Sequence, residues 1–293
     1  EATAIVTFSS WLTVGTITLI SIAQQLANLP VRLIGIPIGQ ASLPFFSRET
    51  GKNDLASLAT MVNNTILEML YLALPASAII LVLRIPLVRL AYGADSFPWA
   101  ETVLTGKLVA ILAISICARA LTHILVRVFY ALRNTTTPLV VNLLSTAINL
   151  GLSYYFLFVV KSGILGMALA ISVASLVETI ILTSILYNLA NFSSSRLLLP
   201  FGKMLALTVI TGIALWVPLR VLDNLIFDTT RTVPLIFLTV TVGCIGLVVY
   251  LGLSYLFQVA ELGVFLRLAR RIGGWHKALS QSNETLETAE TQV

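Results

Sequence analysis

The sequence predicts an all-α protein, a polytopic bundle of about seven transmembrane helices. Of its 293 residues, 57% are hydrophobic and only 11% are charged, whereas soluble domains have about 25% charged residues. A soluble fold has no means of hiding so much apolar surface from water. The apolar stretches are long and continuous, and a bilayer requires every backbone polar group to be paired inside the protein. A helical membrane bundle satisfies both conditions.

The predicted spans follow from the need for roughly 20 apolar residues to cross the bilayer core. Residues 3–13 are expected to end one span, and residues 14–47 to form the next. Pro30 should bend that second span, because its ring removes one helical hydrogen bond. Asp54 is expected to cap the following helix, which runs to about Leu83. The remaining spans are expected at residues 103–127, 138–160, 163–189, 201–221 and 234–257.

The segments outside the spans are short. Residues 85–98 contain two prolines and a glycine and are interpreted as an extramembrane connection, and residues 161–163 as a tight turn. The helical bundle is expected to occupy residues 1–258. A basic amphipathic stretch, 259–279, is suited to lie on an anionic leaflet, and the polar tail, 280–293, has the composition of a disordered segment.

Lysine and arginine are distributed unequally between the two sets of alternate loops and ends. The richer set is expected to face the cytoplasm, which places the C-terminus inside. The richer set comprises Arg48, Lys52, Arg127, Arg133, Arg196, Lys203, Arg267, Arg270, Arg271 and Lys277.

Ionisable side chains inside the predicted spans are functional candidates, because each costs about 2.5–3.5 kcal/mol on insertion scales. They are Arg32, Glu68, Arg119, His123 and Glu178. Four asparagines in the spans, by contrast, are interpreted as hydrogen-bonding links between helices. These are Asn63, Asn64, Asn142 and Asn149.

Arg119, His123 and Arg127 are spaced by four residues and therefore share one helix face. Facing a cavity, this basic stripe would suit an anionic cargo such as a pyrophosphate, which arginine can hold with two hydrogen bonds. The alternative is that Arg119 pairs with a carboxylate to join two helices, while the side chain of Arg127 extends to the membrane interface.

Glu178 has two readings, a structural partner for Arg119 or a site that couples transport to a cation or proton. Glu68 lies nearer the end of its span, where interfacial solvation explains it. Arg32, two residues after Pro30, indicates a broken-helix site of the kind that transporters use.

Several functional classes are excluded by the residues. The net charge is +5, but the charges lie in the breaks between spans, which argues against nucleic-acid binding. Cys117 and Cys244 lie in apolar segments without metal-ligand spacing. The sequence has no phosphate-binding glycine loop, paired-histidine zinc motif or nucleophile turn. We therefore predict no enzyme activity, catalytic residue, metal site or cofactor.

Three stretches carry a family resemblance. The first, Ala23 to Ser47, contains Ala-x-x-Leu-x-x-x-Pro and then a glycine-containing helix that ends in Leu-Pro-x-x-Ser. The second is Leu72-Ala-Leu-Pro-Ala76, and the third combines Phe-Tyr-Ala with Thr137-Pro138. In order and spacing, from about residue 14 to 190, they resemble the MurJ/MviN lipid II flippase family of the multidrug/oligosaccharidyl-lipid/polysaccharide exporter superfamily.

The resemblance implies half of a fourteen-span exporter-type fold, from the end of span seven through span fourteen. The chain also begins at Glu1 without a methionine, and we expect it to be a C-terminal fragment. The implied function is translocation of lipid II, an undecaprenyl-pyrophosphate-linked sugar, across the bacterial cytoplasmic membrane during cell-wall biogenesis. The implied partners are this lipid-linked oligosaccharide, membrane lipids and other cell-wall assembly proteins.

The implied substrate-binding residues are Gln25, Arg32, Arg119 and His123. The family carries an acid–arginine pair where this chain has Gln24 and Gln25, and Arg32, about two helical turns further on, is expected to supply the lost positive charge. Two alternatives stay open. One is a polysaccharide or multidrug exporter of the same superfamily, and the other is a transport-inactive scaffold, which the two glutamines favour.

Overall fold

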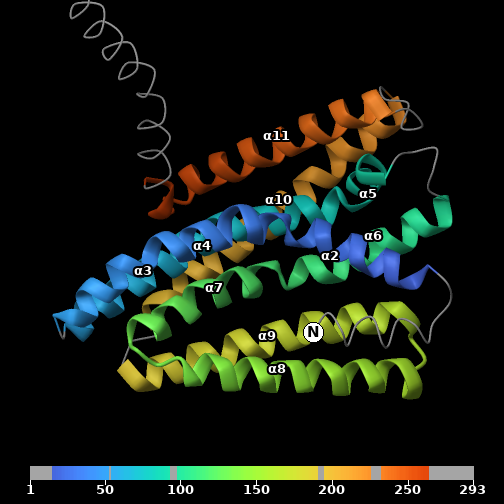
Figure 1. Ribbon diagram of the computed structural model, residues 1–293. Helices are drawn as coiled ribbons and strands as arrows, with labels where there is room; N and C mark the ends of the chain where they lie inside the picture. Colours follow the sequence, from blue (N-terminus) through green and yellow to red (C-terminus); the bar gives the residue numbers. More distant parts are fainter. Residues whose placement is uncertain (1–14, 53, 93–97, 191–194, 226–231, 264–293) are drawn as a thin grey trace, which may run out of the picture.

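The computed structural model describes residues 15–52, 54–92, 98–190, 195–225 and 232–263 as a bundle of long helices (Figure 1). All the regular structure in these ranges is helical, which confirms the predicted fold class. In chain order the elements are α2 (Thr16–Pro30), the π-helix η1 (Val31–Gly35), α3 (Ile36–Gly51), α4 (Leu55–Val82), α5 (Arg84–Tyr92), α6 (Trp99–Ile114), α7 (Ile116–Ala131), α8 (Thr136–Tyr154), the π-helix η2 (Tyr155–Val159), α9 (Gly163–Ala190), α10 (Ser195–Leu225) and α11 (Thr232–Leu256).

Within these residues, six helices are long and apolar enough to cross a membrane, and α6 with α7 forms a seventh if the bent pair is one span. The prediction of about seven spans is therefore confirmed, and the protein is a multi-pass membrane protein. Residues 1–14, most of the stretch 259–279, and the tail 280–293 lie outside the described residues, so the predictions made for them stay predictions.

The span predicted at residues 103–127 is not one straight helix. The axes of α6 and α7 differ by 43°. At the junction, the Ser115 hydroxyl donates a 2.8 Å hydrogen bond to the Leu112 carbonyl oxygen, which also accepts a bond from the Ser115 amide. The last turn of α6 therefore tightens, and the chain changes direction without a proline or glycine.

The connection predicted at residues 85–98 begins with a short helix, α5, which is not among the candidate membrane spans. Pro86 lies in the first turn of this helix, where a missing amide hydrogen costs nothing. Pro86 and Val88 are buried, and α5 packs against α6 and α11. Burial of its apolar side therefore stabilises a helix within this connection.

The interruption predicted at Pro30 takes the form of a π-helical turn rather than a break. The helix continues through Pro30 into η1 and then into α3, so that Thr16–Gly51 forms one span. Pro30 lies directly before this π-turn, in which the Ile36 amide donates to the Val31 carbonyl oxygen five residues earlier. Such turns are frequent at functional sites.

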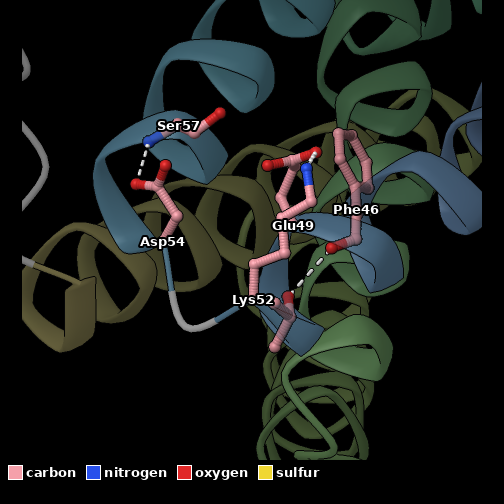
Figure 2. Close-up of polar contacts among 6 residues, drawn as sticks. Phe46, Glu49, Lys52, Asp54 and Ser57 are labelled. Atoms are coloured by element: carbon pink, nitrogen blue, oxygen red, sulfur yellow. Dashed lines mark hydrogen bonds and ion pairs between the residues drawn. The ribbon is translucent and has the colours of Figure 1, made fainter.

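The polar boundaries of the helices agree with the sequence. The Asp54 carboxylate accepts a 2.9 Å hydrogen bond from the Ser57 amide at the start of α4, which confirms the predicted cap (Figure 2). In the same turn Lys52 forms an ion pair with Glu49 at 2.9 Å. The tight turn before α9 has positive φ angles at Lys161 (54°) and Gly163 (60°).

The bundle has two contrasting edges (Figure 1). Helices α8 and α9 form one edge and α11 the other, while α10 crosses behind α4 to meet α11. The main core lies between them, where Phe46, Met69 and Phe129 are among the buried side chains. Large apolar side chains on the outer faces of α8, α10 and α11 are exposed, as expected for surfaces that face lipid.

Candidate functional site

The candidate site is built on α7, whose face carries Arg119, His123 and Arg127. All three side chains are half-buried. The charges of Arg119 and Arg127 act on His123 from either side, as expected from a rise of about 6 Å between residues four apart. The guanidinium group of Arg127 also stacks on the Tyr130 ring at 5.7 Å. The three side chains therefore lie along one face of α7, as their spacing predicted.

A close contact between backbones places η1 and α3 against this helix. A Cβ atom at Gly35 would lie 3.2 Å from the Cα of Ala120, and one at Gly39 would lie 3.2 Å from the carbonyl oxygen of His123. Two glycines four residues apart allow helices to approach closely inside a membrane. Gly35 and Gly39 therefore hold the span Thr16–Gly51 directly beside Arg119 and His123.

The residues predicted to bind the substrate lie on two neighbouring spans. Gln25 in α2 and Arg32 in η1 are exposed, whereas Arg119 and His123 in α7 are half-buried. The structure thus brings Arg119 and His123 together, and it places Gln25 and Arg32 on the neighbouring span. Their role in substrate binding stays a prediction.

Glu178 lies on α9 and is linked to α8. Its carboxylate accepts a 3.2 Å hydrogen bond from the side-chain amide of Asn142. Next to it, the hydroxyl oxygen of Thr179 lies 2.9 Å from both the Thr122 hydroxyl and the Ala118 carbonyl oxygen. This part of α9 is therefore joined by polar contacts to the helix that carries the basic stripe.

The asparagines predicted to join helices do so in two cases. Asn63 accepts a 2.6 Å hydrogen bond from the Tyr187 hydroxyl, and Asn142 donates to Glu178. Asn149, in contrast, accepts a 3.2 Å bond from Ser153 in its own helix, and Asn64 is exposed. Sequence reasoning missed the Thr122–Thr179 pair, for which threonine in an apolar segment is the only signal.

The arrangement places two arginines and a histidine on one face of a helix within the bundle. Arginine side chains can hold a phosphate or pyrophosphate by paired hydrogen bonds, and the low dielectric of the membrane strengthens that attraction. In the part of the chain that the structure describes, no group of three or more His, Cys, Asp or Glu side chains is arranged to hold a metal ion.

Comparison with known proteins gives relatives of one kind. A family model described as "Lipid II flippase MurJ" matches residues 2–237. The probable lipid II flippase MurJ of Bdellovibrio bacteriovorus is 27% identical over 256 residues, which cover 87% of this chain and 48% of that protein. That of Rickettsia prowazekii is 30% identical over 161 residues, which cover 55% of this chain and 31% of that protein. This chain spans about half the length of the curated relatives it matches.

Solved structures share the fold. A structure titled "Lipid II flippase MurJ, inward closed conformation" superposes with a TM-score of 0.70 at 20% identity, covering 87% of this chain and 50% of that one. A MATE structure solved with the compound MaD3S gives 0.55 at 13% identity, covering 89% and 63%. Because the family model matches most of the sequence, the chain belongs to the MurJ family of lipid II flippases.

Proposed function

We propose that the protein translocates lipid II, an undecaprenyl-pyrophosphate-linked sugar, across the bacterial cytoplasmic membrane. The match of residues 2–237 to the MurJ family model carries this proposal. The basic face of α7 supports it, because a pyrophosphate needs cationic partners at membrane depth. Alternating access moves the head group past this face while the lipid tail stays in the bilayer. The C-terminus lies in the cytoplasm, on the side richer in lysine and arginine.

In this proposal Arg119 and His123 hold the pyrophosphate from α7, and Gln25 and Arg32 approach it from the neighbouring span. Arg119 is the residue to change first, because it is half-buried on the same face as His123. Arg119→Ala should abolish complementation of a depletion strain at an unchanged protein level. Arg119→Lys keeps the charge and loses the two-pronged geometry, so partial activity in that variant separates the two contributions.

Arg48→Ala is a matched control, because Arg48 is exposed in the last turn of α3. We expect this variant to complement normally. Normal growth with Arg119→Ala would remove Arg119 from the proposed site.

The proposed function itself is tested by the amount of lipid-linked precursor on the outer leaflet after depletion of the protein. Accumulation inside with a fall outside supports a lipid II flippase. Unchanged precursor on both leaflets rejects it. That result would favour another exported glycan or a scaffold for cell-wall assembly proteins, a role that tolerates loss of the intramembrane charges.

A second candidate, multidrug export, is favoured by the fold shared with the MATE structure. A drug exporter should confer resistance to cationic compounds, and such a protein needs acidic rather than basic cavity residues. Minimum inhibitory concentrations of cationic dyes, measured with and without the protein, distinguish the two functions. The basic face of α7 makes us expect no change.

Glu178 is proposed to hold α8 and α9 together rather than to couple transport to an ion. The hydrogen bond from Asn142 supports this role. Glu178→Gln keeps a carbonyl acceptor for Asn142 and removes the charge, so we expect it to complement. A stable Glu178→Gln protein that does not transport would instead favour the coupling role.

A further inference from the structure

A second surface, distant in sequence from the α7 stripe, combines an apolar groove with a cationic end. The groove has a volume of about 600 Å³ and runs between α4, α6 and α10. Its lining is apolar except for the side chains of Ser77 and Thr208. Both hydroxyls already donate to carbonyl oxygens of their own helices, at 2.7 and 2.8 Å. The groove therefore suits a hydrocarbon chain and offers little to a polar ligand.

The groove opens on the outer surface of the bundle. Val209, Ile213 and Trp216, which line it from α10, are 55%, 66% and 57% exposed. Apolar side chains with this exposure face the bilayer in a membrane protein. The groove is therefore open on the surface of the described helices, where a hydrocarbon chain can lie along it.

A second cavity of about 510 Å³ continues the groove toward one end of the helices. The two share Leu81, Val82, Gly212 and Trp216. The lining of the second cavity adds the cationic side chains of Arg84, Arg89 and Arg220. No acidic residue is among the described residues that line either cavity.

Two tryptophans place this cationic cluster at the depth of lipid head groups. Arg89 stacks on the Trp99 ring at 5.5 Å, and Arg220 stacks on the Trp216 ring at 5.4 Å. Trp99 begins α6, and Arg220 lies near the end of α10. Tryptophan and arginine together are typical of the membrane interface. The same end of the bundle carries α5 and the start of α11 (Figure 1).

From this continuity we propose that the surface is a binding site for one anionic glycerophospholipid. An acyl chain lies in the α4–α6–α10 groove, and the phosphate contacts Arg84, Arg89 and Arg220. Arginine provides the paired hydrogen bonds that a phosphate accepts. The site is separate from the α7 stripe and does not depend on the proposed function, because its test measures lipid binding and not translocation.

The test is a titration of the purified full-length protein in detergent, followed by native mass spectrometry. The probes are phosphatidylglycerol, phosphatidylcholine and undecaprenyl phosphate. We expect one phosphatidylglycerol to bind at least about tenfold more tightly than phosphatidylcholine. Each Arg→Gln change at positions 84, 89 and 220 should weaken phosphatidylglycerol binding about fivefold, in line with the usual contribution of a basic residue near an anionic lipid.

Two control pairs separate the head-group and chain contributions. Lys161→Asn removes a cation at the turn before α9, outside the lining of both cavities, and should leave binding unchanged. A Cβ atom at Gly212 would lie 3.9 Å from the Cβ of Ala78, which is an ordinary contact. The Gly212→Ala variant should therefore bind phosphatidylglycerol normally. The leucine of Gly212→Leu fills the groove, so this variant should bind both phospholipids more weakly.

Three outcomes would overturn the proposal. The first is equal affinity for the two phospholipids, which would mean that the arginines serve only as interfacial anchors. The second is normal phosphatidylglycerol binding by the protein with all three Arg→Gln changes. The third is tighter binding of undecaprenyl phosphate that Gly212→Leu abolishes, which would assign the groove to a prenyl chain.

Discussion

The contacts around α7 and the contact between α10 and α11 hold the same bundle together by different means. Around α7, backbones approach each other at Gly35 and Gly39, and hydroxyl groups link α7 to α9. Between α10 and α11, Gly246 lies against the side chain of Leu215, which packs in an apolar cluster with Leu238 and Val242. The first kind of contact fixes the relative position of two helices, whereas the second can adjust.

This difference corresponds to what each region carries. The rigid contacts hold the basic stripe of α7 in place, as a binding surface requires. The α10–α11 region exposes large apolar side chains, and an apolar groove lies between α10, α4 and α6. A region held by side chains alone can adapt to a lipid chain. Substitutions at the two kinds of contact should therefore differ in cost.

The largest effect is expected for Gly39→Leu. Its side chain would enter the space occupied by the His123 backbone, which cannot rotate away. Separating α3 from α7 should cost about 3 kcal/mol, the upper end for overpacked cores. Unfolding of the protein in detergent measures this cost. Gly151→Leu is the control, because nothing lies within 4 Å of a Cβ atom at Gly151, and it should be near neutral. Equal stability of the two variants would contradict a backbone contact at Gly39.

A smaller loss is expected for Thr179→Val, which keeps the shape and removes the hydroxyl between α7 and α9. Interhelical hydrogen bonds in membranes contribute about 0.6 kcal/mol each, so the loss should be about 1 kcal/mol. The Thr183 hydroxyl donates within α9, to the backbone carbonyl oxygen of Thr179 at 2.7 Å. Thr183→Val is therefore the matched control. Adding Thr122→Val to Thr179→Val should cost less than the sum of the two single changes. Additive costs would show that the two hydroxyls do not interact.

Local signals in the sequence predicted the elements that local chemistry decides. Asp54 caps α4, residues 161–163 turn the chain, and the long apolar segments become spans. The bend at Ser115 was not predicted, because a serine in an apolar segment is compatible with a straight helix. No helix was predicted within the connection 85–98, although Pro86 lies in the first turn of α5, which accepts a proline. The helix α5 depends on packing against α6 and α11, whereas the bend depends on the local hydrogen bonds from Ser115 to Leu112.

The candidate site shows the same limit. The spacing of Arg119, His123 and Arg127 predicted one helix face, because helical geometry alone determines it. The contact of Gly39 with His123 depends on two segments far apart in the chain. A single sequence shows the two glycines four residues apart, but not the helix they pack against. The proximity of the span Thr16–Gly51 to the basic stripe therefore became visible only in the structure.

The smallest effect is expected for Gly246→Ala, compared with Gly35→Ala. The contact distances and the ability of the neighbouring groups to move predict opposite orders for the two stability losses. A Cβ atom at Gly246 would lie 2.9 Å from two methyl carbons of Leu215, closer than the 3.2 Å between a Cβ at Gly35 and the Cα of Ala120. If distance decided the cost, Gly246→Ala would be the more harmful change. The leucine methyl groups can rotate, however, and alanine also favours the helix over glycine. We therefore expect Gly246→Ala to change stability by less than about 0.5 kcal/mol and Gly35→Ala to cost about 1–2 kcal/mol.

Unfolding of both variants in the same detergent gives the order of the two losses. A larger loss for Gly246→Ala would mean that the α10–α11 edge is as rigid as the α7 contacts, and that its groove is preformed rather than adaptable.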